Sequence, residues 1–286
     1  MKIFSKEAVL LGAAAVLLFN ISCTSPVDTA QEKDMGQTMP AAVPQPAAEP
    51  MASPTPSVPD LQAELLDPRH KTTTSPIGSV DFKNFSYPLP RGWQNPDGAD
   101  IALADGKLAA IANELTDDMS DEEKAERKAE RRIGMSYVTS KFLDVTGDGM
   151  DEAIVILQVE TGGSAIPQLV YVYEWKEKKP ELIWYFRTGD RSDGGLKDLR
   201  MENGEFVVEL FGQDRFLLGE VETGRITGDE EQLCCPTYFT RTFYKWNGRN
   251  FLMQRKRMTY LVADPAQPPQ ENLGDKINEQ EKNRKR

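Results

Sequence analysis

Residues 153–186 read AIVILQVETGGSAIPQLVYVYEWKEKKPELIWYF, and this stretch decides the fold. It holds three short runs of β-branched and aromatic residues separated by polar breaks, a pattern typical of successive strands. Breaks this short favour antiparallel neighbours. The stretch therefore predicts a β meander, with strands at 153–159, 169–175 and 182–186.

The same pattern continues on both sides of this stretch. Asn203-Gly204 and Asn247-Gly248 supply the positive φ angles of tight hairpin turns between the later strands. The span from 79 to 261 is long enough, at about 180 residues, for one hydrophobic core. We therefore expect a mainly β domain at 79–261, an antiparallel meander that forms a sandwich, an open barrel or a curved sheet. Its further predicted strands are 80–87, 206–211, 238–246 and 251–260.

One polar helix is expected inside this domain, at about residues 120–133. Ser120 and Glu123 have the spacing of a capping box, and the following run KAERKAERR is polar on nearly every face. Its acids lie near the start and its bases near the end, as the helix dipole prefers. Such a helix is either a solvated insertion or a basic element that binds a partner. A weaker helix is expected at 107–115.

The N-terminal residues 1–22 have the composition of a signal peptide. Lys2 and Lys6 precede an apolar run at 8–19. A helix of that length covers about 18 Å, whereas the hydrocarbon core of a bilayer is about 30 Å thick. The run is therefore interpreted as the apolar part of a signal peptide and not as a transmembrane helix.

The stretch around Cys23 resembles a bacterial lipobox. Ser22 stands directly before the cysteine, while Asn20 occupies a position where that motif usually has leucine. The resemblance implies cleavage before Cys23 and its modification with diacylglyceryl and fatty acyl lipid, such as palmitate. The domain would then be extracytoplasmic in the bacterial cell envelope, anchored to the outer or inner membrane. Ordinary secretion with a free Cys23 thiol is the alternative.

The segments on either side of the domain are polar. Residues 23–78 are rich in proline and alanine, so we expect a disordered tether after the lipidated cysteine. Residues 262–286 are expected to form a disordered polar tail. The chain has a single histidine, His70, which falls in the tether. Sites that need a histidine base or several histidine ligands are therefore excluded.

The formal net charge is −11. Nucleic acid is a poor partner for a chain this acidic, because its phosphates repel the protein. The expected partners are the membrane, through the lipid anchor, and an unknown protein or glycan ligand.

Residues 144–152 read DVTGDGMDE and stand directly before the predicted strand 153–159. Counted from Asp144, oxygen-bearing side chains stand at positions one, three, five and nine, with glycine at position six. That spacing matches a calcium loop. The predicted ligands are Asp144, Thr146, Asp148, the Met150 carbonyl group and Glu152. The alternative is a hairpin turn whose aspartates accept hydrogen bonds from their own backbone amides.

This loop resembles the calcium loops of FG-GAP and VCBS-type extracellular repeats, which join strands. Those repeats form arrays, whereas this sequence holds one full copy. Three ordered blocks also resemble uncharacterised secreted or lipid-anchored bacterial proteins, which implies a shared β fold and an envelope address but no activity. The blocks are DVTGDGMDEAIVIL, TGDRSDGGL and CCPTYFTRTFYKWNG.

Cys234 and Cys235 are adjacent in the sequence. In an oxidising compartment, two adjacent thiols can close only a small, strained ring, so a reducible disulfide between them is predicted. Two separate thiols and a bridge between chains are the alternatives.

Three functional classes follow from these features. The preferred class is a non-enzymatic, membrane-anchored binding module, with a sheet or loop surface that takes a protein, glycan or small ligand. The second is a hydrolase that uses paired carboxylates. The third is an assembly or stabilising partner whose polar helix docks onto another envelope protein. The residues named for the hydrolase are Asp190, Asp193 and Glu209, with Arg187 and Arg191 to position an anion.

Overall fold

A computed structural model describes residues 60–284, except for 92, 94, 113, 161–164, 192, 219–220 and 225–234. Strands dominate the described residues, and every pairing between two named strands is antiparallel. The prediction of a mainly β, antiparallel fold is confirmed.

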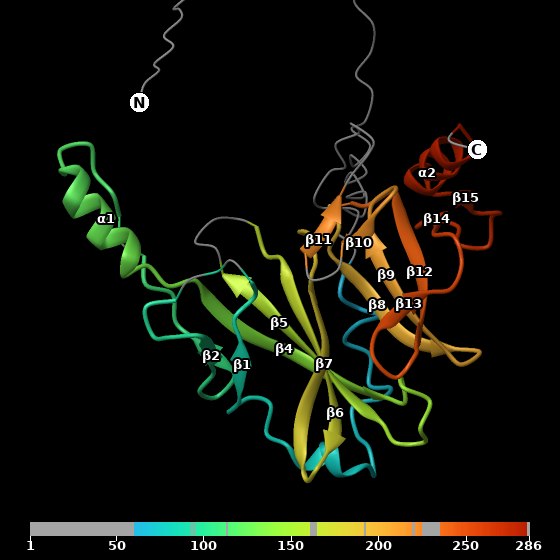
Figure 1. Ribbon diagram of the computed structural model, residues 1–286, viewed down its shortest axis with the longest axis horizontal. Helices are drawn as coiled ribbons and strands as arrows, with labels where there is room; N and C mark the ends of the chain where they lie inside the picture. Colours follow the sequence, from blue (N-terminus) through green and yellow to red (C-terminus); the bar gives the residue numbers. More distant parts are fainter. Residues whose placement is uncertain are drawn as a thin grey trace, which may run out of the picture. The chain divides into compact units, whose positions relative to one another are not determined.

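The first sheet has five strands in the order β3-β4-β5-β6-β7 (Figure 1). The stretch 153–186 supplies its last three strands, in the predicted meander. The strands are β3 Lys107–Leu108, β4 Gly134–Leu143, β5 Glu152–Glu160, β6 Gln168–Lys176 and β7 Lys179–Arg187.

The second sheet has six strands in the order β15-β14-β12-β9-β8, and β13 pairs with β12. Asn203 and Gly204 both have positive φ, 52° and 75°, which makes the tight β8–β9 turn that the sequence predicts. The predicted strand 251–260 is interrupted and forms β13 and β14. The strands are β8 Leu196–Glu202, β9 Glu205–Phe211, β12 Tyr238–Trp246, β13 Phe251–Met253, β14 Met258–Leu261 and β15 Gln270–Glu271.

Two hydrophobic clusters lie on opposite faces of the five-stranded sheet. The first joins this sheet to the six-stranded sheet. The second packs residues from the N-terminal part of the domain against the other face. Successive residues of β5 alternate between the clusters, so the strand is buried on both faces. The first cluster includes Leu65, Ile154, Ile156, Val170, Phe186, Leu199, Phe206 and Val208. The second includes Ile77, Phe82, Tyr87, Ile101, Val155, Leu157 and Tyr171.

Short elements complete the fold. The hairpin β1–β2 and a short 3-10 helix, η1, contribute residues to the second hydrophobic cluster. Strand β10 pairs with β11. Two α-helices, α1 and α2, lie in the described residues. Their bounds are η1 Pro76–Ser79, β1 Ser86–Pro88, β2 Asp100–Ala102, β10 Phe216–Leu218, β11 Val221–Gly224, α1 Asp121–Ala129 and α2 Leu273–Arg284.

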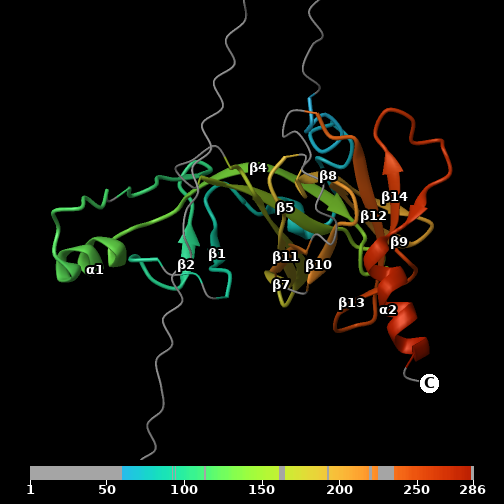
Figure 2. The ribbon, with the colours of Figure 1, turned by 90° about the horizontal axis from the view of Figure 1, so that it is seen from above.

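The predicted helix at 120–133 is confirmed as α1. Ser120 Oγ accepts a hydrogen bond from the Glu123 amide at 3.2 Å, and the Glu123 carboxylate accepts one from the Ser120 amide at 2.8 Å. No residue of α1 is buried. The helix stands apart from both sheets on two connecting segments (Figures 1 and 2). We call residues 109–133 the arm.

Two local predictions were wrong. The predicted strand 80–87 is a turn followed by β1. The Asp81 carboxylate accepts hydrogen bonds from the Lys83 amide and the Asn84 side chain, and such local bonds compete with strand pairing. The predicted helix 107–115 instead starts with β3 and continues as one side of the arm.

The structure departs from the predicted boundaries 79–261 at both ends. Leu65 is fully buried, and Lys71 donates to Thr139 of β4, so part of the predicted tether belongs to the fold. The predicted tail contains β15 and α2, and Asp275 of that helix pairs with Arg257 at 2.5 Å. No helix among the described residues is long and apolar enough to cross a membrane.

Candidate functional site

The Asp-rich loop joins β4 to β5. The Asp144 carboxylate accepts three backbone hydrogen bonds, from Gly147 at 2.7 Å and from Asp148 and Gly149 at 3.1 Å each. Asp148 accepts one from the Met150 amide at 2.8 Å. These bonds hold the loop in a tight turn, and Met150 lies exposed at its tip.

Glu152, the first residue of β5, binds the beginning of the loop. Its side chain is buried and accepts hydrogen bonds from the Val145 amide at 2.8 Å, the Thr146 amide at 3.0 Å and the Thr146 hydroxyl at 3.2 Å. Burial raises the pKa of Glu152 to about 7, although the two amide bonds favour the charged form. The charge of Asp148 raises this pKa further.

The predicted calcium ligands therefore lie in one loop, but their carboxylates are turned toward backbone amides. Within the described part of the chain, no lysine or arginine forms a salt bridge with Asp144, Asp148 or Glu152. The loop is thus a concentration of negative charge without a cationic partner. Its donor set consists of oxygen atoms, which suit calcium.

Three carboxylates converge elsewhere, those of Glu64, Asp198 and Glu209. Four cations contact them. We call these side chains together the ionic cluster, which comprises Glu64, Lys141, Lys197, Asp198, Arg200, Glu209 and Arg241.

Glu209 lies at the centre of the ionic cluster and is 1% exposed. Its carboxylate is 3.0 Å from Lys197, 2.9 Å from Arg200 and 2.5 Å from Arg241. Burial alone would raise the pKa of Glu209, but the three cations outweigh it and hold that pKa below its usual value. Asp198 binds Lys141 at 2.8 Å, and this bond connects the six-stranded sheet to β4.

The ionic cluster is a structural tie between the two sheets. Each of the three carboxylates is already paired with at least one lysine or arginine, and these cations would repel a divalent metal ion. Sequence analysis missed this cluster. The signal that was available is charge inside the predicted strands, such as Glu209 within the run FVVELF.

The residues named for a hydrolase do not form one site. Asp190 accepts a hydrogen bond from the Ile166 amide at 2.9 Å, Asp193 pairs with Arg215, and Glu209 belongs to the ionic cluster. Arg191 is 3.7 Å from Asp190, and Arg187 lies over the ring of Trp93.

The block TGDRSDGGL forms a tight turn that explains its glycines. A Cβ atom on Gly189 would lie 2.1 Å from the Asp193 carbonyl oxygen, and one on Gly195 would lie 2.3 Å from that of Arg191. Only glycine fits at either place. This block therefore has a structural role in the described chain.

Two aromatic pairs of the strands pack against the hydrophobic clusters. Trp184 stacks on Phe251 with ring centres 4.7 Å apart, and Tyr185 stacks on Tyr171 at 5.9 Å. Each pair belongs to one of the two hydrophobic clusters.

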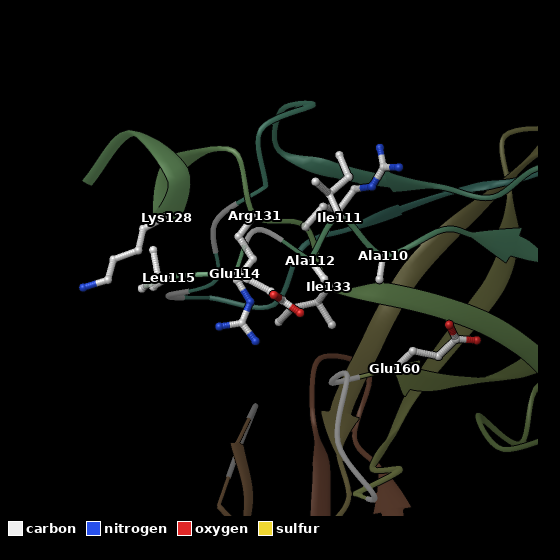
Figure 3. A pocket seen from close by; sticks show the side chains of 10 residues that line it. Ala110, Ile111, Ala112, Glu114, Leu115, Lys128, Arg131, Ile133 and Glu160 are labelled. Carbon is white, nitrogen blue, oxygen red and sulfur yellow. The ribbon is translucent and has the colours of Figure 1, made fainter. Parts of the chain in front are cut away.

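A pocket of about 470 Å³ lies where the arm joins the five-stranded sheet (Figure 3). Its apolar lining comes from both sides of the arm, and the charged groups are three bases and two acids. The lining residues are Ala110, Ile111, Ala112, Glu114, Leu115, Lys128, Arg131, Arg132, Ile133 and Glu160.

The charged groups of the pocket differ in how they are held. Arg132 pairs with Asp97, and Glu160 accepts a hydrogen bond from Ser136. Lys128 and Arg131 are exposed and carry no salt bridge among the described residues. The pocket thus presents two cations to an incoming group.

The predicted cysteine sites are only partly within the described chain. Cys235 is exposed. Cys23 and Cys234 lie outside the described residues, as does the predicted signal peptide, so the lipid anchor and the disulfide stay predictions.

The fold and these sites define an antiparallel β domain that carries a protruding polar arm. No family model, curated protein or solved structure matches the chain.

Replacing the buried centre of the ionic cluster tests its structural role. Glu209→Gln should lower the free energy of unfolding by about 3 kcal/mol, because three cations lose a buried counter-charge. The matched control is Glu202→Gln, which removes a half-exposed carboxylate that also pairs with Arg200 and should cost at most about 1 kcal/mol. Urea unfolding measures both, and equal losses would contradict the assigned role.

The raised pKa of Glu152 makes stability depend on pH. The ordinary pKa is 4.5 and the folded one about 7, so the folded state binds the proton more tightly. Stability contributed by this group is therefore present below pH 4.5 and lost as pH rises toward 7, on the order of 2 kcal/mol. Unfolding in chelator at several pH values should show this fall in the wild type and a flatter profile in Glu152→Gln. Identical profiles would exclude Glu152 as the cause.

Proposed function

We propose that the chain is a non-enzymatic binding module of the bacterial cell envelope, tethered to a membrane through acylated Cys23, with the arm as its binding element. The observation that carries this proposal is the arm itself. The arm contains the nine-residue helix α1, in which no residue is buried. The pocket that exposes Lys128 and Arg131 lies where the arm joins the sheet.

The remaining charged sites favour binding over catalysis. Glu209 is enclosed by three cations, Asp190 accepts a hydrogen bond from an amide, and Asp193 pairs with Arg215. A carboxylate that serves as a general acid or nucleophile needs a second carboxylate and an open approach for the substrate. The arm, by contrast, has its polar groups directed to solvent.

The envelope address rests on the N-terminal sequence. A positive start, a short apolar run and Ser22-Cys23 together resemble the processing signal of lipoproteins. Several acyl chains on one cysteine would anchor the chain stably, because each buried CH₂ group contributes about 0.8 kcal/mol.

We further propose that the Asp-rich loop binds calcium. Asp144, Asp148 and Glu152 supply negative charge without a lysine or arginine partner in the described chain, in contrast to the ionic cluster. Burial, and to a smaller extent the charge of Asp148, raises the pKa of Glu152, and a bound cation would favour its charged form. The bound ion would stabilise the β4–β5 connection rather than take part in a reaction.

A second candidate function is that of an assembly partner that docks its arm onto another envelope protein. The same observation favours it, namely a solvated helix that makes no buried contact with its own domain. The hydrolase alternative has less support, because the three carboxylates that converge in the described residues, those of Glu64, Asp198 and Glu209, are each paired with a lysine.

Lipid modification is tested on the full chain expressed in a bacterium. Intact-mass analysis should show loss of residues 1–22 and the added mass of a diacylglyceryl and a fatty acyl group on Cys23. Cys23→Ser should abolish this mass and move the protein from the membrane fraction to the soluble fraction. An unmodified or uncleaved wild-type N-terminus would exclude the anchor.

Calcium binding is tested by titration of the full chain, first freed of metal with chelator. We expect saturable binding and a melting temperature raised by a few degrees, because a ligand that binds only the folded state stabilises it. Asp148→Ala should abolish both effects, and the control Asp105→Ala, on an exposed turn, should retain them. Absence of binding heat would leave the loop as a hydrogen-bonded turn.

A further inference from the structure

The arm carries opposite charge at its two ends. Residues 116–123, which we call the tip, contain five acidic residues and no base. Residues 124–132 contain five bases and two acids. The acids of the tip are Asp117, Asp118, Asp121, Glu122 and Glu123, and the bases that follow are Lys124, Arg127, Lys128, Arg131 and Arg132.

The two ends also differ in shape. The basic end contributes Lys128, Arg131 and Arg132 to the pocket lining. Ile111, Leu115 and Ile133 supply an apolar part of that lining, which we call the apolar floor (Figure 3). Leu115 is 44% exposed, so part of this apolar surface faces solvent. The tip is polar apart from Met119, which is half-buried. A negative projection with one apolar side chain thus complements a positive hollow with an apolar floor.

The tip and the pocket both belong to the arm, so two copies of the arm can bind each other symmetrically. Two arms laid side by side in opposite directions bring the tip of each onto the pocket of the other. A contact of this kind is isologous and closes on a dimer, so no further copy adds to it. Two copies in parallel would instead place like charges together.

We propose that the arm docks onto the arm of a second copy of this chain, with the tip of each copy in the pocket of the other. Lys128 and Arg131 bind the carboxylates of Asp117 and Asp118, and Met119 contacts the apolar floor. The pocket lining holds three bases against two acids, Glu114 and Glu160 (Figure 3), so these acids reduce its positive charge but do not cancel it.

This inference rests on the proposed function, because it names the partner of the proposed binding element. The membrane anchor would assist it: chains confined to one surface meet at a higher effective concentration than free chains. The contact is solvent-exposed and ionic, so its strength should fall as salt screens the charges.

The test uses two differently tagged full-length chains, co-expressed, extracted in mild detergent at low salt and purified through one tag. The tip variant is Asp117→Lys with Asp118→Lys, which leaves the capping box intact. The pocket variant is Lys128→Glu with Arg131→Glu. Wild-type chains should co-purify, and each variant paired with itself should lose about tenfold or more of the second chain, because like charges then face each other.

The decisive pair is the tip variant with the pocket variant. In that combination a positive tip meets a negative pocket, and a negative tip meets a positive pocket, so both contacts are restored and co-purification should return to the wild-type amount. This recovery also shows that neither variant is misfolded. A control with the same change of charge as the pocket variant, Lys245→Glu with Lys276→Glu at exposed positions, should co-purify in the wild-type amount.

Failure of the mixed pair to recover, or no co-purification of wild-type chains, would overturn the inference. Either result is independent of acylation, since detergent extraction recovers both anchored and free chains. The mass of the N-terminus tests the anchor separately, so a failed dimer and a failed envelope address are distinguishable.

Discussion

Burial of β5 and β6 on both faces is the constraint on which the rest of the structure depends. Ile154 and Ile156 face one hydrophobic cluster, while Val155 and Leu157 face the other. A sheet with two apolar faces needs two covers, because each exposed face would leave a large apolar area in water. The six-stranded sheet covers one face. Residues from Ile77 to Leu103 cover the other face, and Leu65 packs into the cluster between the two sheets, so the fold begins well before residue 79.

The sequence predicts the central strands better than their covers. The run AIVIL is continuously apolar, and such a run indicates a strand buried on both sides. The segment around Leu65 and Ile77 carries isolated apolar residues among prolines and polar residues, so its composition resembles a tether. Its place is determined by contacts with β4 and with both sheets, which no local pattern contains. The prediction of a disordered tail at 262–286 was wrong for the same reason, because Asp275 is held by its ion pair with Arg257, outside that segment.

The two groups of carboxylates show how context decides the chemistry of the same residue type. Glu209 and Glu152 are both buried, yet the pKa of Glu209 is lowered and that of Glu152 is raised. Three cations surround the first, whereas amide groups and Asp148 surround the second. The spacing of DVTGDGMDE was visible in the sequence, but the absence of a counter-charge required the structure. Conversely, the ionic cluster joins residues from five segments, the one around Glu64 and the strands β4, β8, β9 and β12, so spacing alone could not predict it.

The helix of the arm, unlike the covers of the sheet, is predictable from residues that are close together in the sequence. Its helix has a capping box and charges arranged along the dipole, so local interactions favour it without packing against the domain. The sequence could therefore predict the helix without the fold. A helix of nine residues is too short to be stable in water by propensity alone, and the bridge between Ile111 and Arg132 ties its two supporting segments together. A second arm packed alongside would bury part of a helix in which no residue is buried in the described structure.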